Sequence, residues 1–152
     1  MSSSSDIRMM DIGDKPVTKR QAVARGRVLM QAATMGLLKK GKLPKGDVLA
    51  ASRVAGIMAA KETHRLIPLC HPLLIEDVNV EFSLDEKAPV VEITATVKGS
   101  GKTGFEMEAL TAVAISGLTI YDMCKTVDQT LRLDNIRLVK KSGGKSGAIA
   151  LE

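Results

Sequence analysis

Two segments in the middle of the chain alternate between apolar and polar residues. In residues 77–82, Val and Phe alternate with Asp, Asn and Glu, and in residues 91–98, Val, Ile and Ala alternate with Glu, Thr and Lys. A period of two predicts strands with one apolar face and one wet face. Because only residues 85–89 join the two segments, we expect an antiparallel hairpin.

The most apolar part of the chain, residues 104–127, predicts a helix that can cover such a sheet. Ala, Val, Ile and Leu dominate it, and residues 103–106 match a capping box, which satisfies free amides at a helix start. We expect this helix to be buried against the sheet or a partner subunit. Its longest uncharged stretch, residues 109–121, is shorter than the roughly 18 residues of a membrane span, so no membrane segment is predicted.

Weaker signals mark the first part of the chain. Residues 7–12 favour a short strand, and residues 18–21 match a second capping box that predicts a helix to about residue 38. A further helix is expected to begin at Asp47, a good N-cap, and to end before Pro68.

The last strand is predicted at residues 131–138, with a bulge at residues 134–135. The order of elements is then β-α-α-β-β-α-β. With the two early helices taken as one crossover, this is the βαββαβ order of a ferredoxin-like fold, an antiparallel sheet with helices packed on one face. We predict an α+β fold.

A chain of 152 residues is about one domain. We expect a disordered terminus at residues 1–8, the domain at residues 9–147 and a short tail at residues 148–152. No basic region followed by an apolar run opens the chain, and two cysteines are too few for a disulfide framework, so a cytoplasmic protein is expected. Only three aromatic residues are present, which argues against a base-stacking surface for nucleic acid.

Charge is divided unevenly along the chain. Residues 8–45 carry a net +8, residues 46–124 a net −5 and residues 125–152 a net +3. The division suggests that the two basic ends converge on an anion. A lysine-rich solvated surface would give the same pattern. A non-catalytic module that binds nucleotides or phosphates, and a purely structural oligomer, also stay open at this point.

Several motifs are compatible with chemistry without specifying it. The glycine-rich loops at residues 99–104 and 144–146 lack the first glycine of a P-loop, although their backbone amides could still bind an anion. Zinc would need essentially both cysteines and both histidines, with no CxxC or HxxxH pair to organise them. A nucleophilic pair of Cys70 and His71 is disfavoured, because adjacent residues on an extended segment point to opposite faces.

Asp122 and Lys125 lie three residues apart and so on one face of the predicted apolar helix. They form a surface ion pair or, if the helix desolvates them, an acid–base pair in which the pKa of the lysine falls towards neutrality. Capping alone would explain Glu106, and an ordinary loop histidine would explain His71.

Five motifs follow one another over residues 9–147. They are KGDVLAASRVAGIMAAK at 45–61, IPLCHP at 67–72, TGFEMEALTAV at 103–113, LTIYDMCK at 118–125 and KSGGKSG at 141–147. Together they resemble the MoaC family, the cyclic pyranopterin monophosphate synthases of molybdenum cofactor biosynthesis. The resemblance implies a ferredoxin-like subunit assembled as a homohexamer, a trimer of dimers, with active sites between subunits.

The same resemblance implies a reaction. A lyase of this family converts 3′,8-cyclo-7,8-dihydroguanosine 5′-triphosphate, a small molecule derived from GTP, to cyclic pyranopterin monophosphate and releases pyrophosphate. No redox cofactor and no resident metal are implied. Mg²⁺ could accompany the triphosphate, although no acidic cluster requires it. Neither nucleic acid nor a membrane is an expected partner.

Site residues are also carried over from the resemblance. Asp122 is implied as an essential residue, Lys125 as its acid–base partner and Lys45 as a second lysine near the substrate. Lysines of the tail are expected to meet phosphate oxygens as point charges. The implied substrate-binding residues are Leu69, Cys70, His71, Glu106, Met107, Glu108, Lys141 and Lys145.

Overall fold

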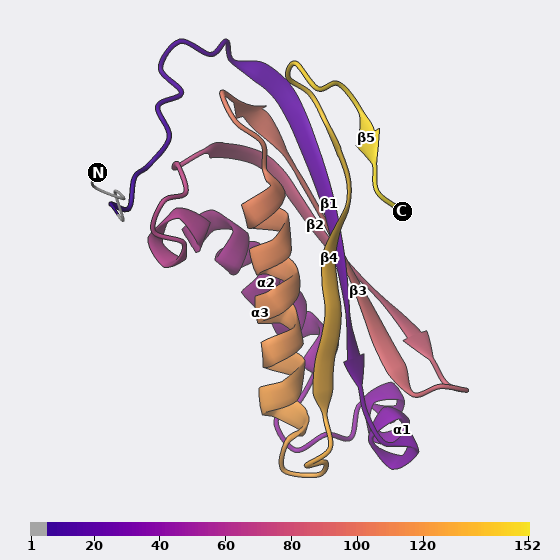
Figure 1. Ribbon diagram of the computed structural model, residues 1–152. Helices are drawn as coiled ribbons and strands as arrows, with labels where there is room; N and C mark the ends of the chain where they lie inside the picture. Colours follow the sequence, from indigo (N-terminus) through magenta and orange to yellow (C-terminus); the bar gives the residue numbers. More distant parts are fainter. Residues whose placement is uncertain (1–5) are drawn as a thin grey trace.

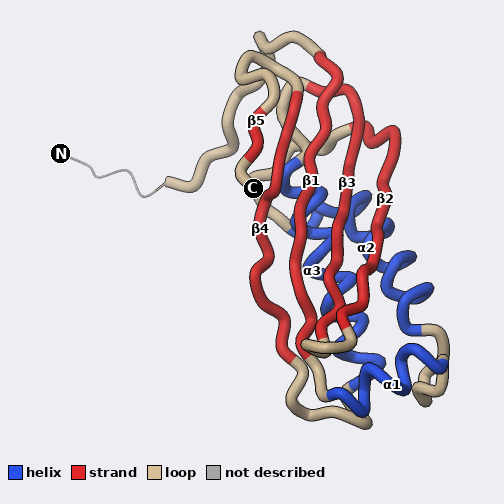
Figure 2. Tube along the Cα trace, turned by 90° about the vertical axis from the view of Figure 1, so that its right-hand side faces the viewer, coloured by secondary structure: helices blue, strands red, loops and turns tan. Residues whose placement is uncertain are grey.

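An antiparallel sheet carries the helices of this chain on one of its faces (Figures 1 and 2). The computed structural model describes residues 6–152. The elements, in chain order, are β1 (Thr18–Leu29), α1 (Ala32–Lys40), α2 (Val48–Leu66), β2 (Leu74–Asp85), β3 (Val90–Gly101), α3 (Glu106–Cys124), β4 (Arg132–Ser142) and β5 (Ile149–Ala150).

The strand order is β2-β3-β1-β4-β5, and every neighbouring pair is antiparallel. Helices α1 and α2 together connect β1 to β2, and α3 connects β3 to β4. The first four strands therefore have the ferredoxin-like order, which confirms the predicted α+β fold. The short strand β5 extends the sheet beside β4 and lies within the predicted tail.

Two predictions about the first part of the chain are wrong. Residues 7–12 form no strand, and residues 18–29, predicted as the start of a helix, form the central strand β1. Apolar residues spaced at both two and four positions made the periodicity ambiguous. Pairing with β3 and β4 decides it, since Ala22, Ala24 and Val28 are fully buried on one face of the strand, as a period of two requires.

The other predicted elements are confirmed with small shifts at their ends. β2 and β3 form the hairpin, with Val80 opposite Ala95. Asp47 caps α2 by accepting a hydrogen bond from the backbone N–H of Ala50 at 3.0 Å. The bulge in β4 is present, and Asn135 there adopts a left-handed backbone with φ of 54°. The capping box before α3 is wrong, because Phe105 is the N-cap and makes no side-chain cap.

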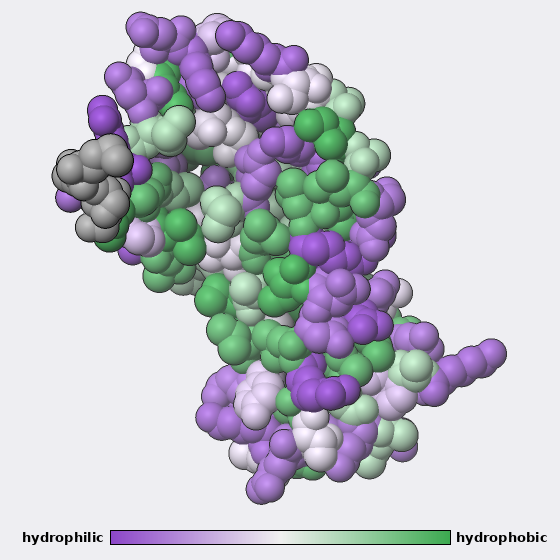
Figure 3. All heavy atoms as spheres, in the orientation of Figure 1, coloured by the Kyte–Doolittle hydropathy of each residue, from purple (hydrophilic) through white to green (hydrophobic). Residues whose placement is uncertain are grey.

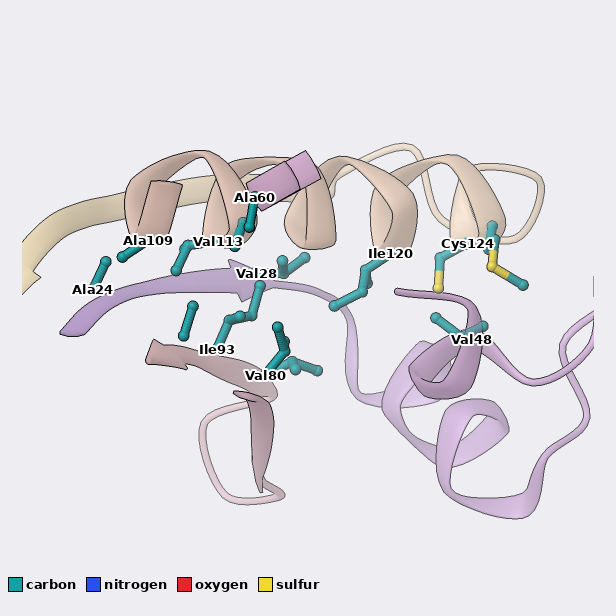
Figure 4. Packing of buried hydrophobic residues seen from close by; sticks show 14 of the residues in the cluster. Ala24, Val28, Val48, Ala60, Val80, Ile93, Ala109, Val113, Ile120 and Cys124 are labelled. Carbon is teal, nitrogen blue, oxygen red and sulfur yellow. The ribbon is translucent and has the colours of Figure 1, made fainter. Parts of the chain in front are cut away.

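Small side chains let α3 lie close to the sheet (Figure 4). At Gly26 in β1, a Cβ atom would lie 2.7 Å from Cγ1 of Val113 in α3, and Ala24 and Ala109 also meet at this layer. Phe105 is the only fully buried aromatic side chain among residues 6–152. Apart from Phe105 and Cys124, the buried core consists of Ala, Val, Ile, Leu and Met, as the scarcity of aromatic residues requires.

Helix α3 is long and apolar enough to cross a membrane by length and composition alone. More than half of it is buried inside the chain, against the sheet and against α2. Core helices of globular proteins pass the same test, and the burial agrees with the prediction that this segment packs against the sheet.

The contact between α2 and α3 gives a first prediction. A Cβ at Gly56 would overlap the Ser116 hydroxyl, so Gly56→Ala should lower the free energy of unfolding by about 1–3 kcal/mol through overpacking. Gly36, in α1, has nothing within 4 Å of a Cβ, so Gly36→Ala should raise it by about 0.5–1 kcal/mol. Urea unfolding at fixed protein concentration measures both, and equal effects of the two substitutions would contradict this packing.

Candidate functional site

The candidate residues identified from the sequence fall into two clusters, one at each end of α3. Glu106 and Asp122 are 16 residues apart on this helix, which corresponds to about 24 Å at about 1.5 Å per residue. The lysine–aspartate cluster consists of Lys45, Asp122 and Lys125. The glutamate cluster consists of Leu69, Cys70, His71, Glu106, Met107, Glu108, Lys141 and Lys145. No single site within one chain can combine the two.

In the lysine–aspartate cluster, Asp122 accepts a hydrogen bond on each carboxylate oxygen. The Lys125 ammonium donates to Oδ1 at 2.9 Å, and the Lys45 ammonium donates to Oδ2 at 2.9 Å. Lys45 lies in the link between α1 and α2, so the cluster joins two segments that are distant in sequence. All three side chains are about half exposed and are therefore accessible to a ligand.

The two ammonium groups set the charge of this cluster. Hydrogen bonds from Lys125 and Lys45 lower the pKa of Asp122 to about 2. Asp122 in turn raises the pKa of Lys125. The expectation of a lowered lysine pKa is therefore wrong for Lys125 in this chain, because its exposed ammonium stays hydrated and bonds a carboxylate. At neutral pH these two residues form a carboxylate–ammonium pair.

In the glutamate cluster, Glu106 and Lys141 form an ion pair at 3.0 Å. Both border a cavity of about 390 Å³ between the start of β1, the start of α3 and the end of β4, a size within the range of small-molecule sites. The lining is rich in cationic side chains, with Lys15, Arg20, Lys141 and Lys145 present against one carboxylate. Such a cavity favours an anionic ligand.

Sequence reasoning missed Lys15, Thr18 and Arg20 in this cavity. The Arg20 guanidinium donates to the backbone carbonyls of Gly101 at 3.0 Å and Lys102 at 3.3 Å, which fixes its position. The Thr18 hydroxyl is buried and has no hydrogen-bond partner in the described chain. These residues were missed because residues 18–29 were predicted as a helix and not as the strand β1. Once residues 18–29 are a strand, Thr18 and Arg20 share a face with Ala22 and point towards the start of α3.

Glu108 is the most deeply buried member of the glutamate cluster, with 4% of its surface exposed. Burial raises its pKa to about 7, and the charge of Glu106 adds to the effect. The Cys70 thiol lies 4.0 Å from Glu108 Oε2 and donates to it, which places the loop after α2 beside the start of α3. Burial and the two glutamates raise the pKa of Cys70, so Cys70 is a thiol here and not a nucleophilic thiolate.

The remaining candidates lie around these groups. Leu69 and Met107 are exposed apolar side chains, and His71 is half-buried. Cys124 is buried at the other end of α3 from Cys70, so the two cysteines cannot share a metal. Within residues 6–152, no three His, Cys, Asp or Glu side chains come together in a group that could hold a metal ion.

Comparison with known proteins assigns the family. The family model for MoaC proteins matches residues 9–144. The chain belongs to the MoaC family.

Three relatives named cyclic pyranopterin monophosphate synthase illustrate the similarity. The protein of Chloroflexus aurantiacus is 59% identical over 147 residues, which cover 97% of this chain and 90% of that protein. The protein of Heliobacterium modesticaldum is 58% identical over 140 residues, covering 92% and 88%. The protein of Natranaerobius thermophilus is 52% identical over 145 residues, covering 95% and 91%. The resemblance stated from the motifs is thereby confirmed.

The MoaC motifs supply both clusters of this chain. The motifs at 45–61 and 118–125 provide the lysine–aspartate cluster, and those at 67–72, 103–113 and 141–147 provide the glutamate cluster. Motif residues that are scattered along the sequence of a MoaC protein are thus gathered at two places by the fold.

Glu108 gives a prediction about pH. Its folded-state pKa is raised from 4.5 to about 7, so the folded chain binds a proton more tightly than the unfolded chain. Stability should therefore fall as pH rises from about 4.5 to 7, and remain lower above that range. Glu108→Gln lacks this pH dependence. The free energy of unfolding of Glu108→Gln, relative to that of the wild type, should therefore increase by on the order of 2–3 kcal/mol as the pH is raised from 4.5 to 8.

Urea unfolding at pH 4.5 and pH 8, at fixed protein concentration, measures this effect. The matched control is Glu106→Gln, which removes a neighbouring carboxylate that is less buried and paired with Lys141. It should keep most of the decline with pH. The same decline in wild type and in Glu108→Gln would contradict the assignment.

Proposed function

We propose that the protein is a cyclic pyranopterin monophosphate synthase, a lyase that converts 3′,8-cyclo-7,8-dihydroguanosine 5′-triphosphate to cyclic pyranopterin monophosphate and releases pyrophosphate. The observation that carries this proposal is the similarity of nearly the whole chain to relatives of that name. The two clusters of motif residues, one of them beside a basic cavity, support it.

The proposal includes a site shared between subunits of a homohexamer built as a trimer of dimers. The separation of about 24 Å between the two clusters supports sharing, since only a second copy can bring them together. Apolar side chains also gather over the helices on the face that the sheet leaves open (Figure 3). By their exposure, Val54, Met58 and Leu66 in α2 and Met107 and Leu118 in α3 are apolar side chains of these two helices that are open to contact with another copy.

The basic cavity is the proposed binding site of the triphosphate. Lys15, Arg20, Lys141 and Lys145 come from the two ends of the chain and can donate charge-assisted hydrogen bonds to phosphate oxygens. Departure of pyrophosphate places negative charge on oxygen, and cationic donors already in position stabilise that charge in the transition state. His71, from the adjacent loop, is a proposed further donor.

Carboxylates at the start of α3 are the proposed contacts of the purine-derived base. Its guanidine-like edge offers N–H groups, which a carboxylate accepts. Glu106 is the more accessible of the two glutamates and is the proposed direct acceptor. Glu108 lies behind it against Cys70, while Leu69 and Met107 provide apolar contact at the rim.

The lysine–aspartate cluster is the proposed source of proton transfer. Asp122 orients Lys45 and Lys125 through one carboxylate oxygen each. Because the pKa of Lys125 is raised, this residue enters the reaction as an ammonium and acts first as a proton donor. Ring closure forms a bond from a substrate hydroxyl oxygen to the α-phosphorus and breaks the bond from that phosphorus to the bridging oxygen of pyrophosphate.

The proposed reaction uses no redox cofactor and no resident metal, and Mg²⁺ bound to the triphosphate is compatible with it. The proposed location is the cytoplasm, and the proposal includes neither nucleic acid nor a membrane as a partner.

Lys125→Ala should lower turnover about 10²–10⁴-fold with the fold intact, as expected for loss of an acid–base group. Pyrophosphate release from the purified protein, supplied with the cyclic dihydro-GTP substrate, measures it. Lys87→Ala, in the exposed turn between β2 and β3, is the control and should keep full turnover. Near-normal turnover of Lys125→Ala would reject its assignment.

A folded wild-type oligomer that releases no pyrophosphate, and binds nucleic acid in a strongly salt-dependent way, would instead support a phosphate-binding module.

Mixed oligomers test whether each site is shared. Lys125→Ala disables the lysine–aspartate cluster, and Lys141→Ala weakens the phosphate cavity, so each protein alone should be nearly inactive at low substrate concentration. Co-expression with two different tags, followed by purification through both, yields oligomers that contain both variants. About a quarter of their sites should combine two intact halves, if each site takes one half from each of two subunits. Recovery of activity to about that fraction supports shared sites, and no recovery would contradict them.

A further inference from the structure

Asp128 is a buried charged residue to which none of the sequence motifs gives a role. Only 2% of its surface is exposed, and its carboxylate accepts four hydrogen bonds within the chain. Oδ2 accepts from the backbone N–H of Gln31 at 2.9 Å and the Thr34 hydroxyl at 2.8 Å. Oδ1 accepts from the backbone N–H of Thr130 at 2.8 Å and the Thr130 hydroxyl at 2.7 Å. Burial alone would raise its pKa, but these bonds outweigh burial and lower it, so Asp128 is a fully bonded carboxylate.

These bonds join two segments of the chain that carry members of the lysine–aspartate cluster. Asp128 lies in the turn directly after α3, where its backbone N–H donates to the carbonyl of Cys124 at 3.1 Å. Gln31, at the N-cap of α1, forms no side-chain cap of its own. The Asp128 carboxylate, just after α3, therefore accepts the hydrogen bonds that the start of α1 donates.

Helix α1 leads directly to Lys45. It ends at Lys40, turns through Gly41 with φ of 65°, and is followed by Leu43, which is buried in the core. The Lys45 ammonium then reaches Asp122 at 2.9 Å. Figure 1 shows α1 near the C-terminal end of α3. The position of α1 thus sets where the Lys45 side chain begins, while α3 sets where Asp122 lies.

We propose that Asp128 is a positioning residue for the reaction, because by fastening the start of α1 to the end of α3 it sets the approach of Lys45 to Asp122. This inference rests on the proposed function, in which the lysine–aspartate cluster serves the reaction. Asp128 itself touches no substrate in this proposal and acts through Lys45.

Two substitutions of the same kind separate this role from general stability. Thr34→Val and Thr130→Val each remove one hydroxyl donor to Asp128, but Thr34 belongs to α1, whereas Thr130 is only two residues from Asp128. Thr34→Val should lower kcat about tenfold with little change in KM, since small misplacements of reacting groups are costly. Thr130→Val should leave kcat within about twofold of the wild type. Thr34→Ser keeps the hydroxyl and should restore kcat.

A double-mutant cycle tests the route through Lys45. In a Lys45→Ala background, Thr34→Val should lower kcat no further, because the group that it misplaces is already absent. Equal kcat values for the Thr34→Val and Thr130→Val variants, or an undiminished effect of Thr34→Val without Lys45, would overturn the proposal. Thr34→Ala removes the same hydroxyl with a smaller side chain and serves if the valine variant does not fold.

A second readout does not depend on activity. Carboxyl NMR of Asp122 should show its pKa rising from about 2 towards its usual range in Thr34→Val, as the contact with Lys45 loosens, and staying low in Thr130→Val. An unchanged pKa in both variants would overturn the positioning role, whatever the protein catalyses. Absence of pyrophosphate release from the wild type, with the pKa of Asp122 shifted as described, would instead refute the proposed function alone.

Discussion

The close approach of α3 to the central strand β1 is the contact on which the rest of this structure depends. Gly26 leaves room for Val113 where any larger residue would force the helix away, and the small side chains of Ala24 and Ala109 lie in the same layer between strand and helix. Displacing the helix would move both clusters at once, because they lie at its two ends. The small residues of β1 are thus a requirement of the site as well as of the core.

The same geometry gives the uneven charge of the chain a structural meaning. β1 begins where β4 ends, with Ala22 opposite Lys141, so the basic head and the basic tail meet beside the start of α3. Lys15 and Arg20 from the head and Lys145 from the tail line one cavity with Lys141. The charge division in the sequence suggested that the two basic ends of the chain converge, and the antiparallel pairing of β1 with β4 brings them together. A solvated lysine-rich surface alone would not explain the shared cavity.

Much of the fold was accessible from the sequence, because the β2–β3 hairpin has a clear period of two, α2 has its Asp47 cap and α3 is the longest apolar segment. β1 was not, since small residues on a central strand fit a helical stripe equally well, and the error hid Thr18 and Arg20. The motifs predicted the members of both clusters but not their separation, which follows from where the motifs fall along α3. Contacts such as Thr34 to Asp128, 94 residues apart, leave no local pattern and required the tertiary structure.

The pKa values of the carboxyl groups at the two ends of α3 are shifted in opposite directions. Two ammonium groups hold the pKa of Asp122 at about 2, while burial raises that of Glu108 to about 7. Groups whose environments separate their pKa values in this way are suited to different roles in acid–base chemistry. In the proposed shared site, the lysine–aspartate cluster therefore supplies a fixed anion flanked by ammonium donors. Glu108, buried behind Glu106 and against Cys70, is instead a carboxyl group that desolvation keeps partly protonated near neutral pH.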